Sequence, residues 1–251
     1  MRIIELELRT ARLAEMKVFY TERLGLALAD ITEHSITIIA GGTRLTFVHE
    51  EEGRILPSYH LAMNIPENQI REAKSWLLDK GCPVLSAEPL PYAGIQANED
   101  IAYFEGTEAH AFYFEDPSGN LVEFIARHRM DNASTKPFDH ESILNISEIG
   151  FPLRGSVTEA IQRLDSRFDV TPFIGDGKTF QMLGDEHGMF ILGDKAVGWY
   201  PTMKIPEVHP IRMTILDPKE GEFQLDPYPY FIRAVSNGQS KGGIKRWKYE
   251  K

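Results

Sequence analysis

The clearest pattern of apolar and polar positions is a short β-hairpin whose second strand is apolar on both faces. Residues 110–126 read HAFYFEDPSGNLVEFIA, and the Asp-Pro-Ser-Gly sequence at 116–119 is typical of a tight turn. In residues 121–126, odd and even positions are both apolar except for Glu123. Because successive strand side chains point to opposite faces, the pattern predicts a strand buried on both sides, with Glu123 as a carboxylate among hydrocarbon.

A buried carboxylate is destabilising unless it is neutralised, paired with a cation or bound to a metal ion. An ion pair between Glu123 and a neighbouring Arg or Lys, or a position at the rim of the sheet, is one interpretation of the strand alone. Metal binding is the other. Glu123 is therefore the residue whose surroundings decide between a structural and a chemical role.

The hydrophobic periodicity elsewhere repeats one order of elements, strand–helix–strand–strand–strand. The first two units are predicted as strands at 2–9, 26–31, 35–39 and 43–48 with a helix at 13–24, then strands at 59–65, 83–85 and 101–105 and the hairpin with a helix at 67–80. Residues 87–99 lie between strands of the second unit and are a candidate lid or substrate loop.

The second half repeats the pattern less completely. The third unit is predicted as strands at 143–153, 170–173, 179–183 and 188–192 with a helix at 156–168, and the fourth as strands at 211–216 and 222–225 without a helix. We therefore expect a first domain at 1–128, a polar linker at 129–142, a second, degenerate domain at 143–235 and a basic tail at 236–251.

Composition excludes several classes of function. The formal net charge of −10 argues against non-specific nucleic-acid binding, which requires basic side chains to neutralise phosphates. The single cysteine, Cys82, excludes an internal disulfide and a cysteine-rich zinc site. The charged start predicts no signal peptide, and the lack of a long apolar run predicts no membrane span. A cytoplasmic protein is the expectation.

Several short motifs together resemble a known superfamily. They are Phe19-Tyr20, Leu24-Gly25-Leu26, His60, and Phe114-x-Asp116-Pro117-Ser118-Gly119-Asn120-x-x-Glu123. With these motifs the chain resembles the vicinal oxygen chelate superfamily, which includes glyoxalase I, extradiol ring-cleaving dioxygenases and the fosfomycin and bleomycin resistance proteins. The resemblance covers residues 1–127 well and 143–226 loosely.

The resemblance implies an α+β fold in which paired βαβββ modules form half-open mixed β-barrels, here as two tandem domains, the second degenerate. It also implies a divalent metal ion (Fe, Mn, Ni or Zn) in the barrel. The metal ligands it implies are Glu5, where relatives usually have His, together with His60 and Glu123. The fourth-strand position of the family falls near Thr46, a poor ligand. Glu5 alternates with Glu7 on a polar face, so a solvated or ion-paired carboxylate is its other interpretation.

Other candidate residues follow from the same resemblance. His110 and Tyr113, with Glu123, are candidate catalytic groups, as His and Tyr serve as acid or base in ring-cleaving relatives. His110 and Tyr113 alternate to opposite faces of one strand, so at most one of them can point into the barrel. Glu148 and His209, with one residue of 224–226, are candidates for a second metal site.

Two classes of function remain open. The first is a metal-dependent lyase, isomerase or ring-cleaving dioxygenase that acts on a small oxygen-bearing substrate. The second is a metal-free binding protein of the bleomycin-resistance type, which sequesters a small molecule in the same barrel. A third possibility is a pair of remnant domains that serve oligomerisation alone. The expected partners are a small molecule and, at most, a second copy of the chain, as a monomer or homodimer.

Overall fold

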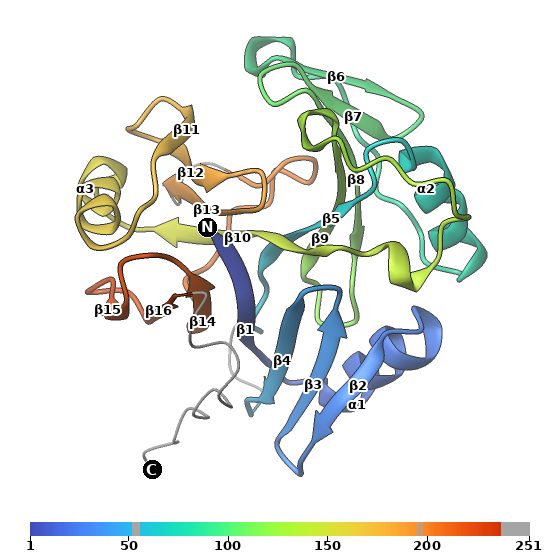
Figure 1. Cartoon of the computed structure of the whole chain (residues 1–251), viewed down its shortest axis with the longest axis horizontal. Coiled ribbons are helices and arrows are strands. Elements are labelled where there is room, and N and C mark those ends of the chain that lie inside the picture. The colour runs from blue at the N-terminus through green and yellow to red at the C-terminus, as the bar shows by residue number, and fades with distance from the viewer. Residues whose placement is uncertain (52–55, 195, 197, 237–251) are drawn as a thin grey trace.

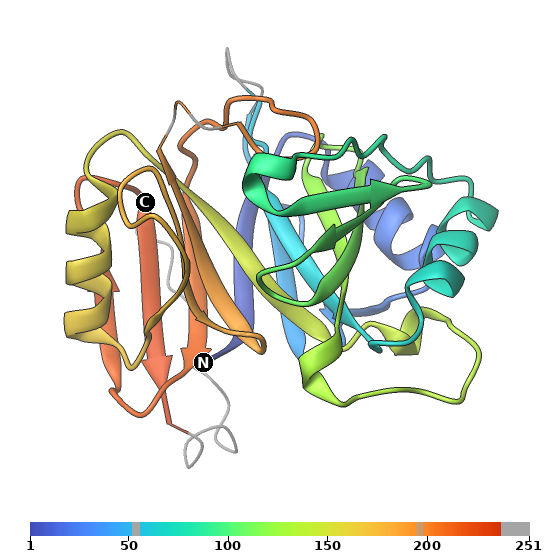
Figure 2. The same cartoon turned by 90° about the horizontal axis from the view of Figure 1, so that it is seen from above.

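The structure is a computed structural model that describes residues 1–51, 56–194, 196 and 198–236. The fold is α+β and consists of two mixed β-sheets with few helices, which confirms the predicted fold class. Figures 1 and 2 show the two sheets side by side, with the helices on their outer sides. The larger sheet curls into a half-barrel (Figure 2).

Each sheet combines strands from both halves of the chain. The seven-stranded sheet has the order β15 (Gly221–Gln224), β16 (Tyr230–Val235), β14 (Ile211–Leu216), β1 (Arg2–Thr10), β4 (Thr43–His49), β3 (Ser35–Ala40) and β2 (Ala27–Ile31). The nine-stranded sheet has the order β11 (Pro172–Gly175), β12 (Phe180–Asp185), β13 (Gly188–Asp194), β10 (Asn145–Leu153), β5 (His60–Ile65), β9 (Leu121–Arg127), β8 (Ala109–Glu115), β7 (Ile101–Phe104) and β6 (Ile95–Asn98).

The strand order shows how the four predicted units pair. In the seven-stranded sheet β1 of the first unit lies antiparallel to β14 of the fourth. In the nine-stranded sheet β5 of the second unit lies antiparallel to β10 of the third. Each half of the chain does carry two units, but the two units of residues 1–128 lie in different sheets. This pairing determines which side chains meet at the candidate site.

The helices cover the outer faces of the sheets and begin or end where local chemistry predicts. They are α1 (Leu13–Lys17), which continues as a π-helix at Val18–Arg23, α2 (Ile70–Asp79) and α3 (Val157–Arg167), with short 3-10 turns at Pro91–Ala93, His128–Met130 and His140–Ser142. Ser156 caps α3 by accepting a hydrogen bond from the backbone N–H of Glu159. Gly81 follows α2 with φ of 72°, a conformation that glycine adopts without strain.

Three details differ from the sequence prediction. Residues 83–85 form no strand, although the backbone N–H of Leu85 donates to the carbonyl of Tyr113. The predicted loop at 87–99 contains β6, and the segment after the fourth-unit hairpin contains β16. β6 is a short edge strand and β16 lies next to an edge strand, and in such strands the alternation of apolar and polar residues is a weak signal. The predicted basic tail lies, from residue 237 onward, outside the described residues.

The tight turn at Gly41-Gly42, between β3 and β4, also holds the two sheets together. The backbone N–H of Gly42 donates to the carbonyl oxygen of Leu144 at 2.7 Å, just before β10 begins. A Cβ atom at Gly41, whose φ is 56°, would overlap that same carbonyl group. Only glycine allows this approach, so the β3–β4 hairpin is fixed against the chain that leads into the nine-stranded sheet.

In the described part of the chain, no helix combines the length and the apolar character needed to cross a lipid bilayer.

Candidate metal centre

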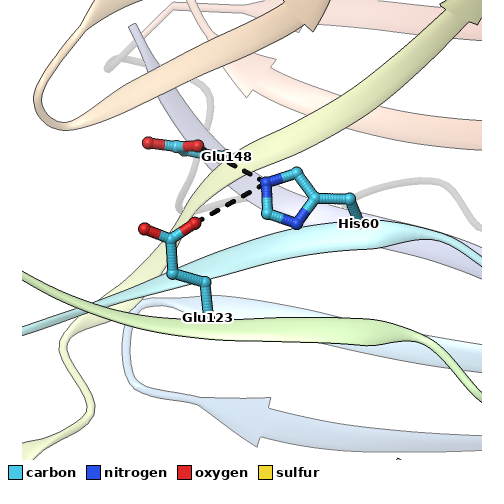
Figure 3. Close-up of side chains that lie close together, drawn as sticks. All are labelled: His60, Glu123 and Glu148. Atoms are coloured by element: carbon cyan, nitrogen blue, oxygen red, sulfur yellow. Dashed lines mark ion pairs between the residues drawn. The ribbon is translucent and has the colours of Figure 1, made fainter. Parts of the chain in front are cut away.

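Three ligand-type side chains lie on one face of the nine-stranded sheet because of its strand register. Ala62 on β5 pairs with Glu123 on one side and with Glu148 of β10 on the other. His60 lies two residues before Ala62 and therefore faces the same way. Since Ala62 carries only a methyl group between the two carboxylates, it leaves room for the imidazole and both carboxyl groups to converge (Figure 3).

The three groups are close together and almost completely buried. His60 Nε2 lies 3.6 Å from Glu123 Oε2 and 3.8 Å from Glu148 Oε2. One ligand atom from each residue lies within 4.8 Å of the other two. The exposed fractions are 7% for His60, 3% for Glu123 and 4% for Glu148. Such a cluster of potential charges is costly in an apolar interior unless the charges compensate one another.

The ring of His60 is oriented by a hydrogen bond to the neighbouring strand. Its Nδ1 lies 3.3 Å from the carbonyl oxygen of Leu121 on the neighbouring strand. A carbonyl oxygen only accepts hydrogen bonds, so Nδ1 carries the proton and donates it. Nε2 is then the ring nitrogen that faces Glu123 and Glu148. Metal-binding histidines are oriented in this way by a hydrogen bond from the other ring nitrogen.

Glu148 is supported by a buried arginine. Arg127, at the end of β9, donates from Nη2 to Glu148 Oε1 and from Nε to Asn64 Oδ1, the latter at 3.0 Å. Burial opposes ionisation of Glu148, but the charge of Arg127 and the hydrogen bonds from His60 and Arg127 outweigh burial and lower its pKa. Glu148 is therefore a carboxylate, with Oε1 held by Arg127 and Oε2 turned towards His60.

Glu123 is supported by a tyrosine on the next strand. Tyr113 on β8 pairs directly with Glu123 on β9, and its hydroxyl donates a hydrogen bond to the Glu123 carboxyl group. Burial, followed by the nearby charge of Glu148, raises the pKa of Glu123 well above its ordinary value. Burial also raises the pKa of Tyr113 well above its ordinary value, and the charges of Glu123 and Glu148 add to this effect. The phenol thus keeps its proton next to the cluster.

An aromatic segment after β13 covers the cluster. The centroid of the Trp199 indole ring lies 5.5 Å from the centroid of the His60 imidazole. A Cβ atom at Gly150 or Gly193 would come within about 3 Å of the indole ring. Tyr200 contacts the ring of Tyr113 edge-on at 5.6 Å and donates from its hydroxyl to the carbonyl of Glu88. We call Trp199 and Tyr200 the aromatic cover. Because Gly150 and Gly193 have no side chains, the indole ring fits above them, and the aromatic cover packs directly on the cluster.

The donor set fits a divalent metal ion. A first-row ion with bonds of about 2.1 Å separates neighbouring ligand atoms by about 3 to 3.6 Å, and the measured separations of 3.6 and 3.8 Å are close to this range. The raised pKa of Glu123 means that a second negative charge beside Glu148 is unfavourable unless a cation compensates it. One imidazole and two carboxylates suit Mn²⁺, Fe²⁺, Ni²⁺ or Zn²⁺. The residues His60, Glu123 and Glu148 can therefore hold such an ion.

Comparison with known proteins gives the family. Residues 2–124 match the model of the Glyoxalase/Bleomycin resistance protein/Dioxygenase superfamily. This part of the chain, residues 2–124, belongs to that superfamily. A solved structure from Bacillus subtilis subsp. subtilis str. 168, provisionally described as a dioxygenase, is 13% identical and covers 93% of this chain and 85% of its own, with a TM-score of 0.59. This similarity shows a shared fold over nearly the whole chain.

A second solved structure matches half of the chain. The lactoylglutathione lyase from Agrobacterium tumefaciens is 17% identical and covers 49% of this chain and 91% of its own, with a TM-score of 0.39. A search of curated protein sequences gives no match. The superfamily commonly binds divalent metal ions and acts on small molecules, which agrees with the donor set of the cluster.

The first-strand ligand implied by the superfamily, Glu5, is not beside His60 and Glu123. Glu5 lies on β1 in the other sheet, where its carboxylate accepts a hydrogen bond from Thr214 at 2.7 Å and pairs with Arg233 at 3.5 Å. The structure places Glu148 next to His60 instead. Glu148 is the first-strand glutamate of the third unit, and the sequence offered it only for a second site.

Glu5 and Glu148 occupy equivalent positions in the two sheets. Each glutamate follows a β-bulge on the strand that pairs with another unit. Glu5 on β1 lies opposite Thr214 on β14, and Glu148 on β10 lies opposite Ala62 on β5. Continuing the same register, Arg233 corresponds to Glu123, because each pairs with the residue opposite the glutamate. Arg212 likewise lies at the position of His60. In the seven-stranded sheet, two arginines therefore stand where the ligands stand in the other sheet.

The remaining candidates lie apart from the cluster, with one exception. His110 pairs with Ala126 and contacts His128, whose Nε2 is 2.7 Å from His110 Nδ1, on the opposite face from Tyr113. His209 packs against Tyr59 with 5.9 Å between ring centroids, and residues 224–226 belong to or follow the edge strand β15. The structure therefore does not assemble the expected second site. The exception is Tyr113, which contacts Glu123.

Sequence reasoning missed two features of the centre. Arg127 shares the face of Glu123 by alternation, four residues along the same strand, but the ion pair suggested for Glu123 was not assigned to this arginine. It pairs with Glu148 rather than with Glu123. Trp199 follows β13 without any periodic pattern, and no local signal in the sequence indicates that its ring covers the site.

Proposed function

We propose that the protein is a metal-dependent enzyme that acts on a small oxygen-bearing substrate at a divalent ion held by His60, Glu123 and Glu148. The observation that supports this most directly is the convergence of one imidazole and two carboxylates within 4.8 Å in an almost fully buried site. An acidic pair placed there only for structure would be destabilising, and two hydrophobic residues would serve the core better.

The residues around the cluster have defined parts in this proposal. A bound divalent ion would supply Lewis acidity towards a substrate oxygen. His60 is oriented by the carbonyl of Leu121, and Glu148 by Arg127, so two of the three ligand groups are fixed before anything binds. Tyr113 holds a proton beside Glu123 and is the candidate to donate a proton to a substrate. The aromatic cover excludes water from the site.

Metal analysis of protein purified without a chelator tests the proposal. We expect about one first-row ion per chain, which is lost in His60→Ala, Glu123→Ala and Glu148→Gln. Glu5→Gln is the matched control, because it removes a carboxylate from the equivalent position of the other sheet and should leave the metal content unchanged. Protein that holds no ion after incubation with Fe²⁺, Mn²⁺, Ni²⁺ or Zn²⁺ would refute the enzyme proposal. It would support a metal-free protein that sequesters small molecules.

The reaction type is a separate question. Both a lyase or isomerase and a ring-cleaving dioxygenase are consistent with a phenol and an ion at one site. Consumption of oxygen on addition of a catechol to Fe²⁺-loaded protein would identify ring cleavage. Turnover of a thiol-hemiacetal without oxygen would identify an isomerase or lyase.

A further inference from the structure

Arg127 carries one hydrogen-bond donor group that finds no acceptor among the described residues. The side chain is completely buried, and its Nε and Nη2 donate to Asn64 and Glu148. Its third nitrogen, Nη1, is also buried and has no hydrogen-bond partner in the part of the chain that the structure describes. Buried N–H groups almost always have an acceptor, so an unused one in a charged group calls for a ligand.

The unused donor lies at the edge of the candidate metal centre. Arg127 follows Glu123 by four residues on β9, and alternation places both side chains on the same face of the sheet. The guanidinium group is planar and rigid, so Nη1 is fixed beside the Nη2 that holds Glu148. A ligand that reaches Glu148 and Glu123 is therefore also near Arg127.

The charge of the loaded site points to the same kind of ligand. His60 is neutral when Nδ1 donates to Leu121 and Nε2 faces the ion. The carboxylates of Glu123 and Glu148 cancel a divalent ion, and the guanidinium of Arg127 leaves one positive charge. Uncompensated charge in a buried site is unfavourable, so an anion is the ligand that completes the balance.

The surroundings restrict the rest of the ligand. The side chains packed around the cluster on this face are mainly apolar or aromatic, and they include Met189, Ile191, Leu121 and Ile125 together with Trp199. These groups offer few partners for a polar molecule. A compact ligand with one anionic end and an otherwise apolar body matches them.

We propose that the substrate of this site is a small carboxylate, whose anionic oxygen accepts a hydrogen bond from Arg127 Nη1. This inference rests on the proposed metal-dependent function and names the class of substrate for it. Arg127 thereby has two roles: it positions Glu148 and it binds the substrate anion.

Calorimetry with a matched pair of ligands tests the inference. Lactate and lactamide have nearly the same shape, but only lactate carries a carboxylate. With Co²⁺-loaded protein we expect lactate to bind at least about ten-fold more tightly than lactamide. Equal affinities would overturn the carboxylate proposal and leave the metal-dependent function standing. The visible absorption of Co²⁺ shows independently whether the ion is bound, and if it never binds, both proposals fail.

Two lysine variants test the role of Arg127 itself. Arg127→Lys keeps the positive charge but removes the rigid fork, so we expect it to reduce the preference for lactate over lactamide at least about five-fold. Arg129→Lys, on an exposed side chain two residues along, is the control and should leave the preference unchanged. An unchanged preference in folded, Co²⁺-binding Arg127→Lys would exclude Arg127 as the anion-binding group. If that variant does not fold, the ligand pair with the unaltered protein still decides the class of substrate.

Discussion

The buried pair between Arg127 and Glu148 makes the energetic argument for the site testable. Arg127→Met keeps the length of the side chain but leaves Glu148, which is 4% exposed, without its guanidinium partner. Removing one member of a buried ion pair costs about 3 to 5 kcal/mol, because the remaining charge stays out of water. An unfolding entropy of about 2 cal/mol/K per residue amounts to roughly 0.5 kcal/mol/K for 251 residues. We therefore expect the midpoint of thermal unfolding to fall by about 6 to 10 °C.

Urea and thermal unfolding of metal-free protein provide the measurement. Glu148→Gln removes the other member of the pair and should be destabilising for the same reason. The double variant should be more stable than the sum of the two single effects predicts, by at least about 1 kcal/mol, since the two residues contact each other. Arg129→Met, in the exposed pair with Glu108, is the control and should leave the midpoint unchanged. A loss below about 1 kcal/mol in Arg127→Met, or additive effects in the double variant, would refute the reasoning.

Three further predictions concern the cover and the fold. Trp199→Ala should increase the rate at which a chelator removes the ion by at least about ten-fold, because water then reaches the site; an unchanged rate would show that the ring does not control access. Gly41→Ala should lower the free energy of unfolding by more than about 2 kcal/mol, since a Cβ atom would overlap the carbonyl of Leu144; a urea titration that matches the unaltered protein would contradict this. Tyr20→Phe removes the 2.9 Å hydrogen bond to the buried Asp116 and should cost about 1 to 3 kcal/mol by the same titration; a neutral result would mean that other donors compensate.

The sequence predicts the strands and the exposure of their faces well, because both depend on neighbouring residues. Alternation after the turn at 116–119 places Glu123 on a strand that is apolar on both sides, and its exposed fraction is 3%. The cap at Ser156 and the turn at Gly41 are equally local. Each of these features depends on the order of side chains over a few residues, which the sequence states directly.

The pairing of the units is not local, and for this reason the sequence does not show that Glu5 and His60 lie in different sheets. β5 can form an antiparallel ladder with β1 or with β10 through the same backbone hydrogen bonds, and the entropy of closing a longer loop differs only slightly. The sequence does show a glutamate on the first strand of both units. It does not show which of them lies opposite Ala62, so Glu148 can be assigned to the centre only from the strand order.

The two sheets contain the same backbone position, and the charges of the side chains there determine whether it is suited to a metal ion or to an ion pair. In the nine-stranded sheet, Glu123 and Glu148 outnumber Arg127, so the position could hold a cation. In the seven-stranded sheet the equivalent position combines Glu5 with Arg233 at 3.5 Å, and Arg212 stands at the place of His60. Guanidinium groups repel a metal ion and supply the positive charge themselves, so the carboxylate there is already compensated. One backbone position serves as a candidate metal centre in one sheet and as an internal ion pair in the other because two side chains differ in charge.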